Sequence, residues 1–210
     1  LLALLVTLLS GIGISRLKVD TFSIGFFKDG HEVPQDSLWL EENYGSYTPI
    51  EFVATAPSDR LAEVLWSLES WEGKIQTRKD VGYIRGLVQP LQQIHASFGV
   101  EQEAHLPTDG EALEQLMFLY EMAPNSDLDS LFQRDGDEIL IRMTVGIPML
   151  SAKGFADQIE VLQSAAALPN DIHLQPSGYI PLYVEIMNLI VRSQLSSFAL
   201  AFVVIFLSIG

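Results

Sequence analysis

The segment EILIRMTV, Glu138–Val145, decides the fold that we expect for this chain. Successive side chains of a strand point to opposite faces, so Ile139, Ile141, Met143 and Val145 would share one face. A glycine and a proline follow within three residues and should end the strand. The pattern therefore predicts a strand with one apolar face, which a layer of helices can cover.

A second strand and a helix are predicted upstream of this segment. Ile50–Ala54 is short and rich in residues that favour strands. Apolar residues then recur with the helical period of 3.6 over Leu61–Trp71. The apolar stripe consists of Leu61, Val64, Leu65, Leu68 and Trp71. We expect Ser58 to cap this helix and Gly73 to end it.

The middle of the chain predicts smaller elements. We expect a weaker strand over Val81–Val88 and a short helix that starts near Pro90 and ends at Gly99. The capping box Thr108–Glu111 predicts another helix, and Asp127–Gln133 predicts a helical turn. The inward side chains would be Leu91, Ile94, Phe98, Leu113, Leu116, Met117 and Tyr120.

The last third of the chain predicts a helix, a strand and a final helix. Ala152–Leu168 would be helical, and its buried side chains would be Phe155, Ile159, Leu162 and Ala166. Asp171–Gln175 would be a short strand, and a helix would begin after Gly178. The order of elements contains two β-α-β units. It predicts an α+β fold with a ferredoxin-like, split β-α-β sheet covered by helices on one face.

Both ends of the sequence are apolar. Leu1–Ile14 and Phe198–Gly210 carry no charge, and each is shorter than the roughly 20 residues that span a bilayer. We expect them to be parts of two membrane helices, flanked by Arg16 and Arg192 near the headgroups, with Ile14 and Phe198 on the same side of the domain. The expected divisions are a membrane-helix end at 1–15, a connecting segment at 16–46, an extracytoplasmic domain at 47–178, a linking helix at 179–195 and a membrane-helix start at 196–210.

Composition and motifs point away from several functions. The net charge of −15 disfavours nucleic acid and anionic lipid surfaces, and the absence of cysteine excludes zinc–thiolate sites, disulfides and thiol catalysis. The four histidines lack metal-site spacing, and the acids of Asp127–Glu138 have Phe132 where a calcium loop needs glycine. We therefore assign no catalytic residue, metal or cofactor, and expect no enzyme.

Three stretches carry a resemblance to a known family. They are RLKVDT after the first apolar run, LEENYGSYTPIEFV at Leu40–Val53, and the exit from His173 to Gly210, with Ser193, Gln194 and Ser197 before the second apolar run. Together they resemble the extracytoplasmic domain of resistance–nodulation–division (RND) exporters, and most of all the lipid-exporting MMPL branch. The Leu40–Val53 segment favours the second of that family's two repeats.

The resemblance implies a porter domain of ferredoxin-like type in the inner membrane, facing the periplasm. It implies proton-driven export of lipids or other hydrophobic molecules, with the bilayer, the substrate and the rest of the transporter as partners and a homo-oligomer left open. The family's proton-carrying acids lie in later membrane helices, so no proton-relay residue belongs to this sequence. The alternative function is a ligand-binding domain of a membrane-anchored sensor or scaffold. Residues beyond Gly210 would discriminate the two, since an exporter needs several further spans.

A substrate path for a lipid-like molecule needs apolar side chains near the membrane. The candidates are Phe22, Phe26 and Phe27 after the first apolar run, and Tyr179, Tyr183 and Met187 before the second. The last three recur every four residues and so share one helical face. Aromatic rings and methionine suit a variable apolar ligand. The alternative is that these side chains are interface anchors or simply pack on the domain.

Overall fold

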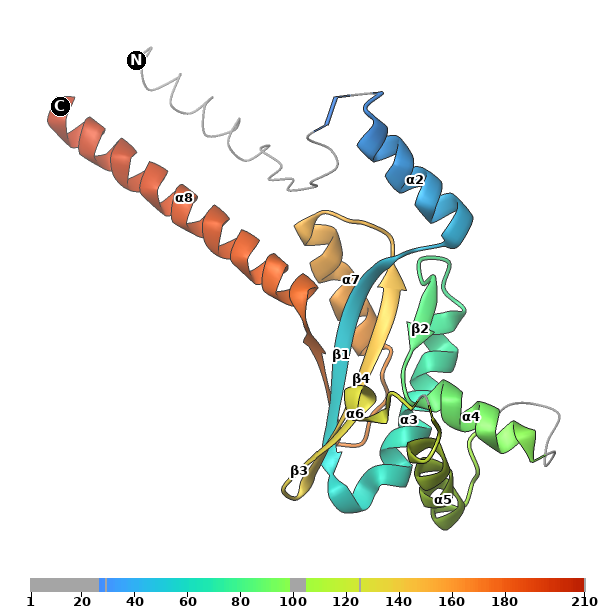
Figure 1. The fold of residues 1–210 in the computed structure, drawn as a ribbon. Helices are drawn as coiled ribbons and strands as arrows, with labels where there is room; N and C mark the ends of the chain where they lie inside the picture. Colours follow the sequence, from blue (N-terminus) through green and yellow to red (C-terminus); the bar gives the residue numbers. More distant parts are fainter. Residues whose placement is uncertain (1–26, 29, 99–104, 125, 210) are drawn as a thin grey trace.

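The computed structural model describes residues 27–28, 30–98, 105–124 and 126–209 (Figure 1). The first apolar run, Ile14, Phe22, Phe26 and Gly99 lie outside the described residues, and so do the predictions made for them. The described chain is an α+β fold built around one antiparallel sheet.

The sheet is centred on two long strands, β1 (Thr48–Pro57) and β4 (Glu138–Ile147). β1 pairs with β4 along its whole length, and the other edge of β1 pairs with β5 (His173–Ser177). β2 (Tyr83–Arg85) and β3 (Phe132–Asp135) both pair with β4 and therefore share its second edge. The strand order is β2-β4-β1-β5, and every pairing is antiparallel.

Both long strands were predicted correctly, and each is longer than expected. Ile139, Ile141, Met143 and Val145 are fully buried on one face of β4, as the alternation predicts. The two short outer strands differ from the prediction. β5 begins at His173 because the Ile172 amide donates to the Pro169 carbonyl at 3.0 Å, which holds the preceding residues in a turn. The strand expected over Val81–Val88 is limited to β2, because a helix begins at Val88.

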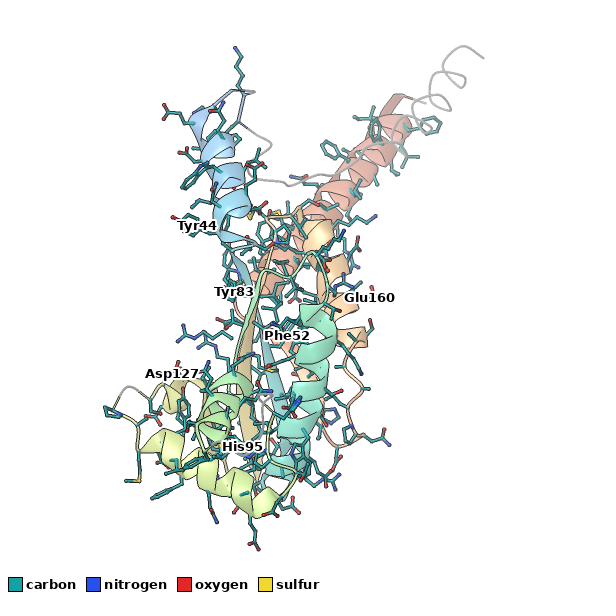
Figure 2. The ribbon with its side chains drawn as sticks, turned by 90° about the vertical axis from the view of Figure 1, so that its right-hand side faces the viewer. Tyr44, Phe52, Tyr83, His95, Asp127 and Glu160 are labelled. Carbon is teal, nitrogen blue, oxygen red and sulfur yellow. The ribbon has the colours of Figure 1, made fainter. Side chains whose placement is uncertain are left out.

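Helices α3 (Leu61–Gln76) and α7 (Ala152–Ser164) cover the apolar face of the sheet. Trp71 of α3 links the two helices and the sheet: its ring meets Phe52 edge-on at 5.5 Å between centroids, and its Nε1 donates to the Leu162 carbonyl at 2.8 Å. Figure 2 shows Phe52 in the interior between sheet and helices. The predicted stripe of α3 is buried throughout, so the two helices and the sheet share one core.

Several helix ends differ from the prediction. Ser58 does not cap α3. Ser58–Arg60 forms a short 3-10 turn (η2), and the Ser58 amide donates to the Asp137 carbonyl. Gly73 does not end α3. The helix continues to Gln76, because Ile75 packs in the core. In α5 (Gly110–Glu121) the cap is Asp109, whose carboxylate accepts the Ala112 amide, and not Thr108.

The remaining helices are α2 (Glu32–Tyr44), α4 (Val88–Ser97), α6 (Leu128–Leu131) and α8 (Tyr179–Ile209). Three further corrections concern helical segments. The turn predicted over Asp127–Gln133 is shorter, because Phe132 already pairs with β4. Phe98 does not point into the core but is 61% exposed. The helix predicted to reach Leu168 ends at Ser164, where α7 gives way to the link to β5.

Candidate functional site

α8 is a continuous helix of 31 residues, so it is about 46 Å long. It starts directly after β5, where Gly178 adopts a positive φ of +81° that favours glycine. Its segment Tyr179–Ser208 is long and apolar enough to cross a membrane. The most apolar 18-residue window of this segment has a mean hydropathy of 1.9, and none of that window is buried against the rest of the chain. Figure 1 shows it leaving the domain as a single arm.

The first turns of α8 pack on the domain. Ile180 is 5% exposed, and the Tyr183 ring meets Phe155 of α7 edge-on at 6.3 Å between centroids. Tyr179 stacks on Tyr183 at 6.0 Å but is itself 73% exposed. Met187 is half-buried one turn further along. The structure thus brings Tyr179 and Tyr183 together, with Tyr183 tied to the core and Tyr179 facing outward.

A second apolar stripe lies on another face of the same part of α8. It consists of Leu182, Ile186 and Leu189, which are 55%, 44% and 58% exposed. The spacing of four and then three residues predicts that a helix runs through them, but they were not among the residues predicted for the substrate path. Before it reaches the segment expected in the membrane, α8 therefore presents apolar side chains on more than one side.

Phe27 is the only member of the first candidate cluster among the described residues. It is 42% exposed, and its ring lies 4.8 Å from the His31 ring at the start of α2. Figure 1 shows that the start of α2 and the end of α8 point away from the same end of the sheet. Figure 1 also shows that α2 and α8 diverge, and the ring contact of Phe27 is with His31 whereas that of Tyr179 is with Tyr183.

α2 itself is held to the domain by polar contacts. None of its residues is buried, and Trp39 and Tyr44 are 55% and 75% exposed. Its Glu41 carboxylate accepts the Met149 amide at 2.7 Å, and the hydroxyl groups of Ser37 and Tyr47 are 2.6 Å apart. α2 is therefore an exposed helix anchored at its second half.

A buried acid, Glu72, lies on the inner side of α3. Its side chain accepts a hydrogen bond from the Gln89 amide group of α4 at 2.6 Å, while its other oxygen, Oε1, has no partner among the described residues. It is 5% exposed. Burial, followed by the nearby Glu69 carboxylate, raises the pKa of Glu72 to about 8, although the Gln89 bond opposes this. Glu72 is thus neutral in the folded domain at pH 7.

Two half-buried carboxylates tie peripheral elements together. Asp127 accepts bonds from the Tyr120 hydroxyl and from Arg85, whose guanidinium is 2.7 Å away. These two bonds, the Tyr120 bond first, lower the pKa of Asp127. Asp80 bonds to Arg78 and to Gln158 of α7, and the Arg78 bond is the main cause of its lowered pKa. Both groups are structural links between segments rather than a reactive pair.

The histidines of the described residues do not gather into one metal site. The His95 ring and the His105 carbonyl share a hydrogen bond of 2.7 Å, and His95 lies at the end of the domain remote from α8 (Figure 2). No group of three potential metal ligands occurs in the part of the chain that the structure describes.

Comparison with known proteins assigns no role to these residues. No family model matches the chain, and neither a curated protein nor a solved structure matches it.

Proposed function

We propose that this chain is the extracytoplasmic porter domain of a proton-driven exporter of the RND superfamily, close to the MMPL branch, which moves lipids or other hydrophobic molecules. In this proposal α8 links the domain to the inner membrane, and the domain faces the periplasm. This role needs no catalytic group and no cofactor in the chain, and the driving protons would pass through other parts of the transporter.

The fold part of the proposal is a ferredoxin-like, split β-α-β arrangement. Its support is the strand order β5-β1-β4-β2, in which β1 and β2 are connected through α3, and β4 and β5 through α7. In each case the two connected strands are separated by one antiparallel strand. That is the pattern which two interleaved β-α-β units produce.

The observation that carries the proposal is the continuity of α8. Its first turns are packed on α7 through Tyr183 and Phe155, and its later turns, from Phe198 to Leu207, expose large apolar side chains to the surroundings. A helix that is rigidly packed at one end and apolar all round at the other suits a domain whose motion is coupled to a membrane span.

A topology experiment tests the membrane part directly. The chain has no cysteine, so single cysteines can be introduced without background. In the complete protein, Ser97→Cys on the domain should react with a membrane-impermeant maleimide added to intact spheroplasts. Ser208→Cys near the end of α8 should react only after the membrane is dissolved. Labelling of Ser208→Cys from outside, at the rate of Ser97→Cys, would contradict a membrane span.

An export experiment tests the function. Cells that lack the complete protein should lose a class of lipid from the outer envelope or the medium, and the wild-type protein should restore it. Tyr179→Ala combined with Met187→Ala should restore less at equal expression, because it removes the candidate path. The matched control is Leu182→Ala with Leu189→Ala, on the other stripe of α8.

The sensor or scaffold alternative predicts a different outcome of the same experiment. Deletion would then leave the envelope lipids unchanged while a cellular response to an external ligand is lost. Unchanged lipids in the deletion strain would overturn the exporter proposal and favour that alternative.

A further inference from the structure

The end of the domain that lies opposite α8 contains an open groove of about 770 Å³. The lining residues belong to α5, α6, β3 and the start of α3, and Figure 1 shows these elements at the far end of the sheet from α2 and α8. Its floor is apolar and consists of side chains from four elements: Leu61, Met117, Leu128 and Phe132. A groove of this size can bury much of a small organic molecule.

Phe118 makes the apolar lining accessible. It belongs to α5, lines the groove and is 60% exposed, although it carries one of the largest apolar side chains. Met117, its neighbour in the same lining, is 7% exposed and closes the floor. The groove therefore offers a ligand both a buried apolar floor and a free aromatic ring.

The rim of the groove is acidic. Glu114 and Glu121 lie two turns apart on α5, and Asp129 of α6 belongs to the same lining. None of these carboxylates has a hydrogen bond or an ion pair with another described residue. The single base in the lining is Arg134, so the lining has a formal charge of −2.

The lining already contains one contact between a cation and an aromatic ring, that of Arg134 with Phe132. The guanidinium carbon of Arg134 lies 5.8 Å from the centre of the Phe132 ring, so a cation of the chain itself already occupies an aromatic face in the lining. A cation over an aromatic ring is stabilised by the ring quadrupole. Phe118 offers a second ring that no side chain of the described residues stacks on, between carboxylates that would favour positive charge.

We propose that this groove is a binding site for small amphipathic cations, whose apolar body lies on Phe118 and the floor and whose charge is balanced by Glu114, Glu121 and Asp129. An anion of the same shape would meet three carboxylates and is excluded. The proposal concerns binding at the end of the domain away from α8, and it does not depend on export.

Tetraphenylphosphonium is a suitable probe, because tetraphenylborate has the same shape and the opposite charge. Binding of both ions to the full chain in lipid nanodiscs would be measured by equilibrium dialysis, with empty nanodiscs of the same lipid subtracted. We expect saturable binding of the cation only. The triple variant Glu114→Gln, Glu121→Gln, Asp129→Asn should weaken it about tenfold, because the three carboxylates that balance the charge of the cation are removed.

Two control variants separate the groove from general charge and from general hydrophobicity. Asp36→Asn, Glu42→Gln, Glu111→Gln changes the net charge equally at exposed acids outside the groove. The second groove variant is Phe118→Ala, which removes the exposed ring of the lining. Its control is Phe98→Ala, because Phe98 is 61% exposed and lies on the surface near the end of α4.

The groove variants should weaken binding while both controls stay within about twofold of the wild type. The proposal is overturned if the cation does not bind above empty nanodiscs, if the anion binds equally, or if the control variants weaken binding as much as the groove variants.

Discussion

Glu72→Gln tests whether the buried acid of α3 makes the stability of the domain depend on pH. The substitution keeps the shape of the side chain and the acceptor for the Gln89 amide group, but it removes the titrating proton. The new carboxamide next to Gln89 changes the free energy of unfolding by the same amount at every pH, because it does not titrate. The informative quantity is therefore the slope of the free energy of unfolding against pH, rather than its value at one pH.

The magnitude follows from the two states of the carboxyl group. Its pKa is about 8 in the folded domain against an ordinary value of 4.5. Between these values the folded chain holds a proton that the unfolded chain has released, so the free energy of unfolding falls as pH rises. The slope is at most about 1.4 kcal/mol per pH unit, and the total loss by pH 8 is on the order of 5 kcal/mol. Above pH 8 the loss levels off.

Urea unfolding of the full chain in nanodiscs between pH 5 and pH 9 measures this slope. Trp71, adjacent to Glu72 and fully buried, reports the unfolding by its fluorescence. Wild type should lose stability through this range, and Glu72→Gln should lose clearly less. Glu160→Gln, at an exposed acid of α7, should follow the wild type. Equal slopes for wild type and Glu72→Gln would refute the burial argument.

Three further substitutions test the packing. Leu65→Asp puts an unpaired charge where the side chain is fully buried, so the domain should not fold, as judged by loss of its thermal transition. Asp109→Ala should lower the free energy of unfolding by about 1 kcal/mol, whereas Thr108→Ala should change it little, because the cap of α5 is Asp109; urea titration distinguishes them. Gly146→Ala should destabilise the domain by several kelvin in melting temperature, because a Cβ there overlaps the Tyr83 ring; an unchanged melting temperature would contradict the close approach.

The local periodicity of the sequence was sufficient for the long elements. The alternation in β4 and the stripe of α3 predict which side chains are buried, because a regular backbone places residues at fixed spacing on the same face. The apolar content and length of α8 can likewise be read from the chain. These are properties that neighbouring residues determine together, so no other part of the molecule is needed to predict them.

Helix ends and short strands depended on tertiary contacts. Thr108 and Asp109 are both good capping residues, and only the backbone path into α5 selects Asp109. The helix continues past Gly73 because Ile75 has a place in the core. β3 has no alternation of buried residues and becomes a strand because β4 offers it a free edge.

The candidate sites depended on the tertiary structure even more. Tyr179 and Tyr183 share one helical face in the sequence, yet α7 covers Tyr183 and leaves Tyr179 exposed. Glu72 follows Leu68 by four residues, so helical spacing places it on the buried face of α3, but its raised pKa depends on the neighbouring elements that exclude water from it. The groove brings the start of α3 together with α5, α6 and β3, which lie much later in the chain. Periodicity determines which face of an element is apolar, whereas burial and charge at a site depend on which other elements fold against it.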